Sequence, residues 1–173
     1  MKNKFLNKIY LIIILILFSF TANAEENKNI NEHQINAFVG NFDFSDNKQK
    51  AILVGFQHQN ENLERDTFLG NISPITGGFL TENSAAYIYT GVEWNYAIGD
   101  KLKFTPSFAP GIYHEGNGKD LGHALEFKTE VQASYSVSGS TSIGMSYNHI
   151  SNASLGDKNP GANSYMFNLL KNF

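Results

Sequence analysis

No cysteine occurs in this chain of 173 residues. That absence excludes disulfide cross-links and thiolate metal sites, and the five histidines are too scattered to predict a metal centre. Stability must therefore come from burial and backbone hydrogen bonding. Basic residues are also in the minority, since 13 Lys and Arg face 16 Asp and Glu. We expect neither nucleic acid as a partner nor a metal or other cofactor.

Long apolar runs are scarce as well, and the one that stands out spans residues 9–20. Three lysines precede this run and Ala22-Asn23-Ala24 follows it, which predicts a secretory signal peptide cleaved after Ala24. A membrane anchor is the alternative, but the run is shorter than the roughly 20 residues that span hydrocarbon. We therefore expect residues 1–24 to be a signal peptide and residues 25–173 to form one exported domain.

Alternation of apolar and polar residues dominates the chain from about residue 33. Segments of about ten residues with this period, separated by Gly, Asn, Asp and Ser, are typical of a transmembrane β-barrel. We predict an all-β fold, an eight-stranded antiparallel barrel of the bacterial outer membrane. The expected strands cover approximately residues 34–44, 50–59, part of 67–82, 88–98, 101–112, 125–137, 140–150 and 164–173. Pro106 and Pro110 each remove a backbone donor, so we expect the strand that holds them to be bulged or distorted.

The polar face of the expected strands carries too many charges for the core of a soluble protein. Glu126, Lys128 and Glu130 share one face of segment 125–137, opposite an apolar face. A barrel interior accommodates them, and there the glutamates at 93, 126 and 130 can pair with the lysines at 101, 103 and 128. The alternative is a soluble β-sandwich that buries the apolar face and exposes the charged one.

The last two expected strands place a His and a Ser on the lipid-facing wall. With an even number of strands both termini lie on the periplasmic side, so residues 151–163 form an extracellular loop. His149 and Ser151 continue the outward-facing row of Met145 and Tyr147, with backbones about 6.6 Å apart. They suit a general base and a nucleophile, or else an ordinary interfacial polar pair. The final strand ends on the aromatic Phe173, which resembles the signal that the barrel-assembly machinery recognises.

Residues 149–161, His-Ile-Ser-Asn-Ala-Ser-Leu-Gly-Asp-Lys-Asn-Pro-Gly, closely resemble the signature of the lipid A 3-O-deacylase (PagL-like, acyloxyacyl hydrolase) family. The resemblance extends to residues 105–111, 118–122 and 125–127. It implies an eight-stranded outer-membrane barrel whose lipid-facing Ser-His-Glu site hydrolyses the ester-linked acyl chain at position 3 of lipid A. Lipid A, as part of lipopolysaccharide, and the surrounding membrane lipid would be the partners. By the resemblance Ser151 is the nucleophile, His149 the general base and Asn152 a contributor to the oxyanion hole.

The third catalytic position departs from the family, because Asn163 stands where the family has Glu. An amide in place of the carboxylate of a serine-protease triad lowers turnover by roughly 10⁴. The alternative is therefore an inactive barrel that binds lipopolysaccharide or has a structural role. Asp157 is the only nearby acid the sequence offers as a substitute, and a solvated turn residue next to Lys158 is the role that fits it better. The sequence leaves homodimer formation open.

Overall fold

The computed structural model describes residues 33–46, 49–68 and 70–173. The predicted signal peptide lies outside these residues, so it stays a prediction. Among the described residues no helix has the length and apolar character needed to cross a membrane.

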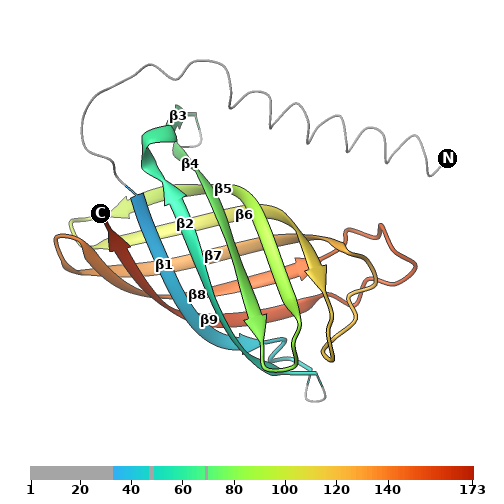
Figure 1. The fold of residues 1–173 in the computed structure, drawn as a ribbon. Helices are drawn as coiled ribbons and strands as arrows, with labels where there is room; N and C mark the ends of the chain where they lie inside the picture. The colour runs from blue at the N-terminus through green and yellow to red at the C-terminus, as the bar shows by residue number, and fades with distance from the viewer. Residues whose placement is uncertain (1–32, 47–48, 69) are drawn as a thin grey trace. The chain divides into compact units, whose positions relative to one another are not determined.

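Eight long antiparallel strands form a closed barrel (Figure 1). Each strand pairs with the next along the chain, β2 pairs with β4, and β1 pairs with β9 to close the ring. The predicted fold class is confirmed. The strands are β1 (His33–Phe42), β2 (Ala51–Asn60), β4 (Gly70–Thr81), β5 (Ala86–Ile98), β6 (Leu102–His114), β7 (Leu125–Ser138), β8 (Thr141–Ser151) and β9 (Ala162–Asn172).

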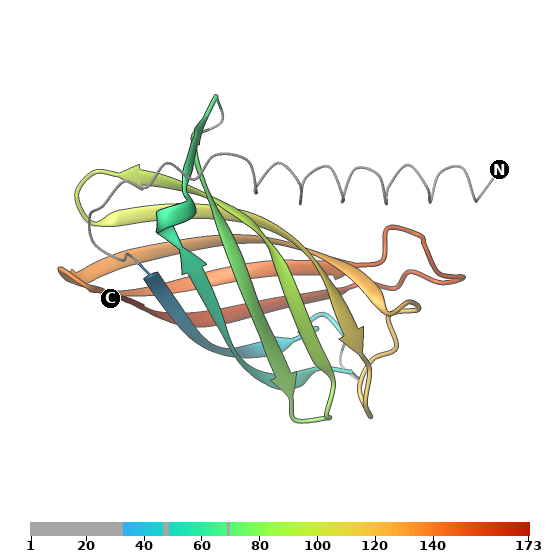
Figure 2. The same ribbon diagram turned by 45° about the horizontal axis from the view of Figure 1, so that its top comes forward.

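Two short elements of the described chain lie outside this ring. The short 3-10 helix η1 (Glu61–Leu63) and strand β3 (Arg65–Thr67) follow β2, and β3 pairs only with the start of β4. They project from the end of the barrel where β1 begins and β9 ends (Figure 2). The sequence analysis placed a single strand in this region and did not foresee this extension.

The barrel wall has an apolar outside and a polar inside, as the alternation predicts. Phe104 and Tyr135 are exposed on the outer face, whereas Glu93, Glu126 and Lys128 are at most 4% exposed inside. The soluble-sandwich alternative requires the reverse arrangement and is therefore wrong. An antiparallel ring with this polarity satisfies its backbone groups and still offers hydrocarbon an apolar surface.

The charged interior is only partly paired as expected. Lys128 Nζ lies 2.9 Å from Glu130 Oε2 and 4.0 Å from the centre of the Tyr89 ring. Lys101 does not join this network, because its ammonium lies over the outward-facing Tyr135 ring. Its place in the turn between β5 and β6 lets the long side chain reach the outside, which the parity of a strand could not reveal.

Pro106 and Pro110 interrupt pairing without shifting the register. The ladder between β5 and β6 skips the positions of both prolines, yet the pairs before, between and after them keep the same register. The pairing of β6 with β7 runs through both positions. The strand is therefore not bulged at either proline, and the expected distortion is confined to local breaks in its pairing with β5.

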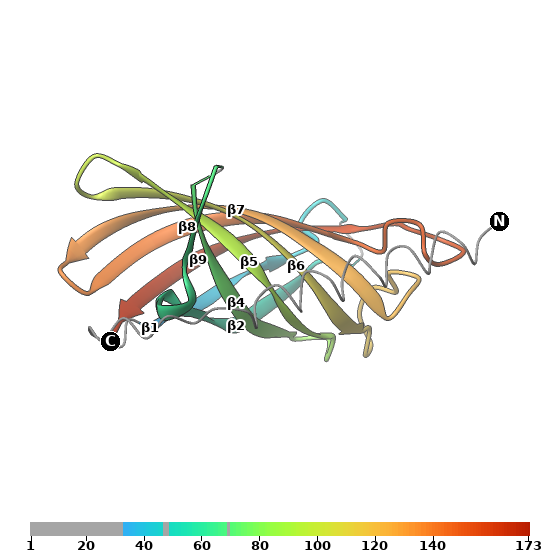
Figure 3. The ribbon, with the colours of Figure 1, turned by 90° about the horizontal axis from the view of Figure 1, so that it is seen from above.

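The loops at the two ends of the barrel differ. The start of β1 and the end of β9 lie at one end of the barrel, together with the short turns at 99–101 and 139–140. The other end carries the segments that follow β1, β4, β6 and β8. The segment after β8, residues 152–161, extends well beyond the strand ends (Figure 3). The predicted His and Ser lie at this loop-bearing end.

Candidate active site

The core of the site is a pair of side chains that face each other across β8 and β9. His149 and Asn163 are direct partners in the antiparallel register. The ring Nδ1 lies 2.9 Å from Asn163 Oδ1, and both side chains are partly exposed on the outer wall. The structure therefore brings these two candidate site residues together.

The hydrogen bonds around the Asn163 amide determine which ring nitrogen of His149 carries the proton. Asn163 Oδ1 can only accept, so the His149 Nδ1–H donates to it. The Tyr147 hydroxyl donates to the same oxygen over 2.8 Å. With Nδ1 protonated, the lone pair lies on Nε2, which is the form that a general base requires.

Ser151 lies two residues beyond His149 and shares its outward parity. Its hydroxyl makes no hydrogen bond to any described residue, and no bond joins it to His149. Opposite Ser151 on β7 stands Phe127, whose ring stacks with Phe108 at 6.1 Å between centroids. The candidate nucleophile is thus partly exposed next to an aromatic surface, with its hydroxyl available to a substrate.

Gly161 makes close contact with the candidate base. Its φ of +62° lies in the left-handed region. A Cβ at this position would lie 2.9 Å from His149 Cε1 and 3.4 Å from Nε2. The glycine that ends the loop therefore leaves the space in which the imidazole lies.

Asn152 does not point its side chain toward the outer wall, as an oxyanion-hole side chain would have to. Its residue is fully buried, and its Nδ2 donates to the carbonyls of Leu121 at 2.7 Å and Lys158 at 2.9 Å. Its backbone N–H donates to Asn159 Oδ1 at 3.1 Å. The reason is parity, since the residue after an outward-facing Ser151 faces inward.

The acid closest to Asn163 is one that the sequence analysis missed. Asp43, directly after β1, accepts the backbone N–H of Asn163 on Oδ1 at 3.2 Å. It is 1% exposed and forms an ion pair with Lys119. Closure of the ring brings the loop after β1 beside the start of β9. The predicted pairing of the first and last strands could therefore have indicated that Asp43 lies near Asn163. Asp157 lies in the exposed part of the loop after β8.

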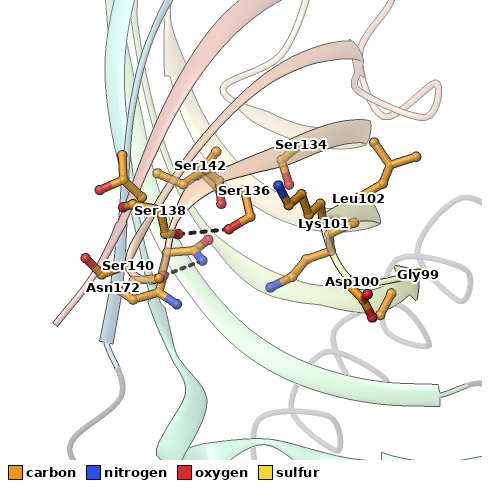
Figure 4. A pocket seen from close by; sticks show the side chains of 16 residues that line it. Gly99, Asp100, Lys101, Leu102, Ser134, Ser136, Ser138, Ser140, Ser142 and Asn172 are labelled. Carbon is orange, nitrogen blue, oxygen red and sulfur yellow. Dashed lines mark hydrogen bonds between the residues drawn. The ribbon is translucent and has the colours of Figure 1, made fainter.

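A cavity of about 190 Å³ lies at the opposite end of the barrel, among serines near the turns at 99–101 and 139–140 (Figure 4). It contains none of the candidate site residues. Within the described ranges no group of three or more His, Asp or Glu side chains could hold a metal ion. The candidate site itself consists of Ser, His and Asn side chains on the outer wall.

Comparisons with known proteins give a family and a fold. The family model described as lipid A 3-O-deacylase (PagL) matches residues 42–172. No curated protein matches the chain. Among solved structures, the chain resembles the outer membrane enzyme PagL at 20% identity and a TM-score of 0.60, over 80% of this chain and 98% of that one.

Two other barrels are similar at lower identity. Neisserial surface protein A matches at 10% identity and a TM-score of 0.56, over 82% of this chain and 96% of the other. A de novo designed transmembrane β-barrel matches at 10% identity and a TM-score of 0.55, over 84% and 98%. At these identities the structural matches support the barrel fold alone.

Proposed function

Because this chain belongs to the lipid A 3-O-deacylase (PagL) family, we propose that it hydrolyses the ester-linked acyl chain at position 3 of lipid A in the outer leaflet of the outer membrane. The observation that carries the proposal is the contact of 2.9 Å between His149 and Asn163, on the same outer wall as Ser151. That contact holds the imidazole in the tautomer of a base, two residues from a Ser151 hydroxyl that makes no hydrogen bond to a described residue.

In the proposed reaction Ser151 Oγ attacks the ester carbonyl while His149 Nε2 takes the hydroxyl proton. The C–O bond to the sugar then breaks, and the imidazolium returns the proton to the departing sugar oxygen. Water, activated by the same nitrogen, releases the fatty acid and regenerates Ser151. Asn163 orients the ring throughout, and no metal or cofactor takes part.

Asn152 remains our proposed contributor to the oxyanion hole, now through its backbone N–H. The N–H of the residue after a nucleophilic Ser is a common oxyanion donor, because it lies beside the attacked carbon. Here it donates to Asn159 Oδ1, so the substrate oxyanion has to displace that amide. The Asn152 side chain has a different part, joining the loops at Leu121 and Lys158.

The surroundings of the site favour a membrane lipid as substrate. Phe127 and Tyr147 flank the site on the apolar outer wall, so an acyl chain can approach from the side without leaving hydrocarbon. The loop-bearing end suits the extracellular side, where lipid A is found. We also propose export by the predicted signal peptide and insertion by the barrel-assembly machinery.

Mass spectrometry of lipid A from cells with and without the protein tests this proposal. Expression should remove the mass of one 3-hydroxyacyl chain, and Ser151→Ala should abolish that loss while the barrel still folds. The second candidate function, a barrel that binds lipopolysaccharide without hydrolysing it, is favoured by the amide at position 163. It is supported if the wild type and a folded Asn163→Glu variant are both inert yet retain lipopolysaccharide.

A further inference from the structure

Asp43 lies at the end of a chain of hydrogen bonds that starts at the candidate base. His149 Nδ1 contacts Asn163 Oδ1 at 2.9 Å, and Asn163 Nδ2 donates to Ser45 Oγ at 3.5 Å. Ser45 Oγ in turn donates to Asp43 Oδ1 at 3.3 Å. We propose that Ser45 and Asp43 are positioning residues, which hold the Asn163 amide with its oxygen toward His149. A carboxylate, whose two oxygens are equivalent, would need no such partners. This inference rests on the proposed function.

The direction of the chain follows from its carboxylate end. A carboxylate can only accept, so the hydroxyl proton of Ser45 points to Asp43 and a lone pair of Ser45 is left for Asn163 Nδ2. The amide nitrogen therefore faces Ser45 and the amide oxygen faces His149. The Tyr147 hydroxyl donates to the same oxygen in this orientation. Because a phenol can also accept, the selection comes from Ser45.

The orientation matters because an amide, unlike a carboxylate, has two different ends. With the amide reversed, Nδ2 would donate to Nδ1 of His149 and the ring would carry its proton on Nε2. Such a ring cannot accept the proton of Ser151. A glutamate at position 163 offers only acceptors and needs no such selection, whereas Asn163 requires partners that distinguish its ends.

Asp43 is held firmly enough to serve as this anchor. It is 1% exposed, pairs with Lys119 and accepts the backbone N–H of Asn163 at 3.2 Å. Its own backbone N–H donates to Ser164 Oγ at 3.4 Å, and the N–H of Phe44 donates to the Asn163 carbonyl at 3.0 Å. Together with the hydrogen bond from Asn163 to Ser45, these three hydrogen bonds to residues 163 and 164 join the loop after β1 to the first residues of β9. Because Lys119 offsets the charge of Asp43, orientation is the main effect of the chain.

Ser45→Ala is the most direct test, since Ser45 is exposed and its removal breaks the chain without emptying a core. We expect kcat for lipid A deacylation to fall at least about tenfold, with loss of the correct tautomer setting a limit near 10⁴. KM should change little. Ser84→Ala, at another exposed loop serine of the same barrel end, is the control and should keep wild-type activity.

Two further measurements separate positioning from mere structure. The ¹⁵N spectrum of the His149 ring in detergent micelles should show Nδ1–H in the wild type and a shift toward Nε2–H in Ser45→Ala. In an Asn163→Asp background, Ser45→Ala should have no such effect on activity or spectrum. Asp43→Asn should behave like Ser45→Ala where the barrel still folds.

The outcomes distinguish this inference from the proposed function. A wild type whose Ser151-dependent activity and His149 tautomer are unchanged by Ser45→Ala refutes the inference and leaves the function standing. If no variant deacylates lipid A, the proposed function fails, while the spectra alone still support or overturn the role of the chain in orienting Asn163.

Discussion

Replacement of Asn163 by an acid is the perturbation that probes this site most directly. Asn163→Asp is nearly isosteric, so its carboxylate oxygen can keep the present 2.9 Å contact to His149 Nδ1. Asn163→Glu supplies the residue that the family usually has, with one more methylene. Both variants add a negative charge where imidazolium forms during attack by Ser151, so both should raise turnover.

The size of the gain can be bounded from this geometry. Exchange of carboxylate for amide in a serine triad lowers turnover by roughly 10⁴, which corresponds to about 5 kcal/mol in the barrier. Much of that loss comes from the wrong tautomer, which the hydrogen bond from Asn163 to Ser45 already prevents in our proposal. The buried carboxylate of Asp43 also repels a new charge at position 163. We therefore expect both acid variants to raise turnover, but by clearly less than the limit of roughly 10⁴.

The assay is release of fatty acid from purified lipid A by protein in detergent micelles, followed by mass spectrometry under single-turnover conditions. Ser151→Ala in each background measures the residual rate without the nucleophile. Should both acid variants fold, keep Ser151-dependent hydrolysis and gain nothing, the third position does not limit turnover and our account of Asn163 is wrong. Activity that survives Ser151→Ala would mean that the nucleophile is misassigned.

Two other substitutions test the packing of the site and the interior of the barrel. Gly161→Ala should lower kcat at least tenfold and cost about 1–2 kcal/mol of stability, because its φ is +62° and the new methyl lies 2.9 Å from His149 Cε1. Gly139→Ala, with nothing within 4 Å, is the control for the same activity and urea-unfolding measurements. Lys128→Met should destabilise the barrel by roughly 3–5 kcal/mol, since it leaves the largely buried Glu130 carboxylate without its cation. Adding Glu130→Gln should recover much of this loss, and a double mutant no more stable than Lys128→Met would contradict the ion-pair argument.

The sequence predicted the wall of the barrel well because each strand carries its own evidence. Alternation fixes which side chains face outward, and β8 and β9 then put His149 opposite Asn163 with only a loop between them. No local pattern shows that the turn before β6 lets Lys101 reach the outside. Nor does one show that the two prolines interrupt pairing with β5 but not with β7. Ser45 and Asp43 were missed because their relation to Asn163 spans more than a hundred residues. It depends on how β1 meets β9 and on a loop conformation in which Asp43 has a φ of +48°.

The pairing of β1 with β9, which closes the barrel, also completes the proposed site. His149 comes from β8 and Asn163 from β9. Ser45 and Asp43, the partners proposed to orient Asn163, come close only when β1 pairs with β9. A chain that has made every hairpin and has not yet joined its two edges still has the Ser and the His, without the aligned amide. If the proposed function is correct, the site becomes competent for hydrolysis only when the barrel closes. An intermediate that is still open would then not attack the lipids around it.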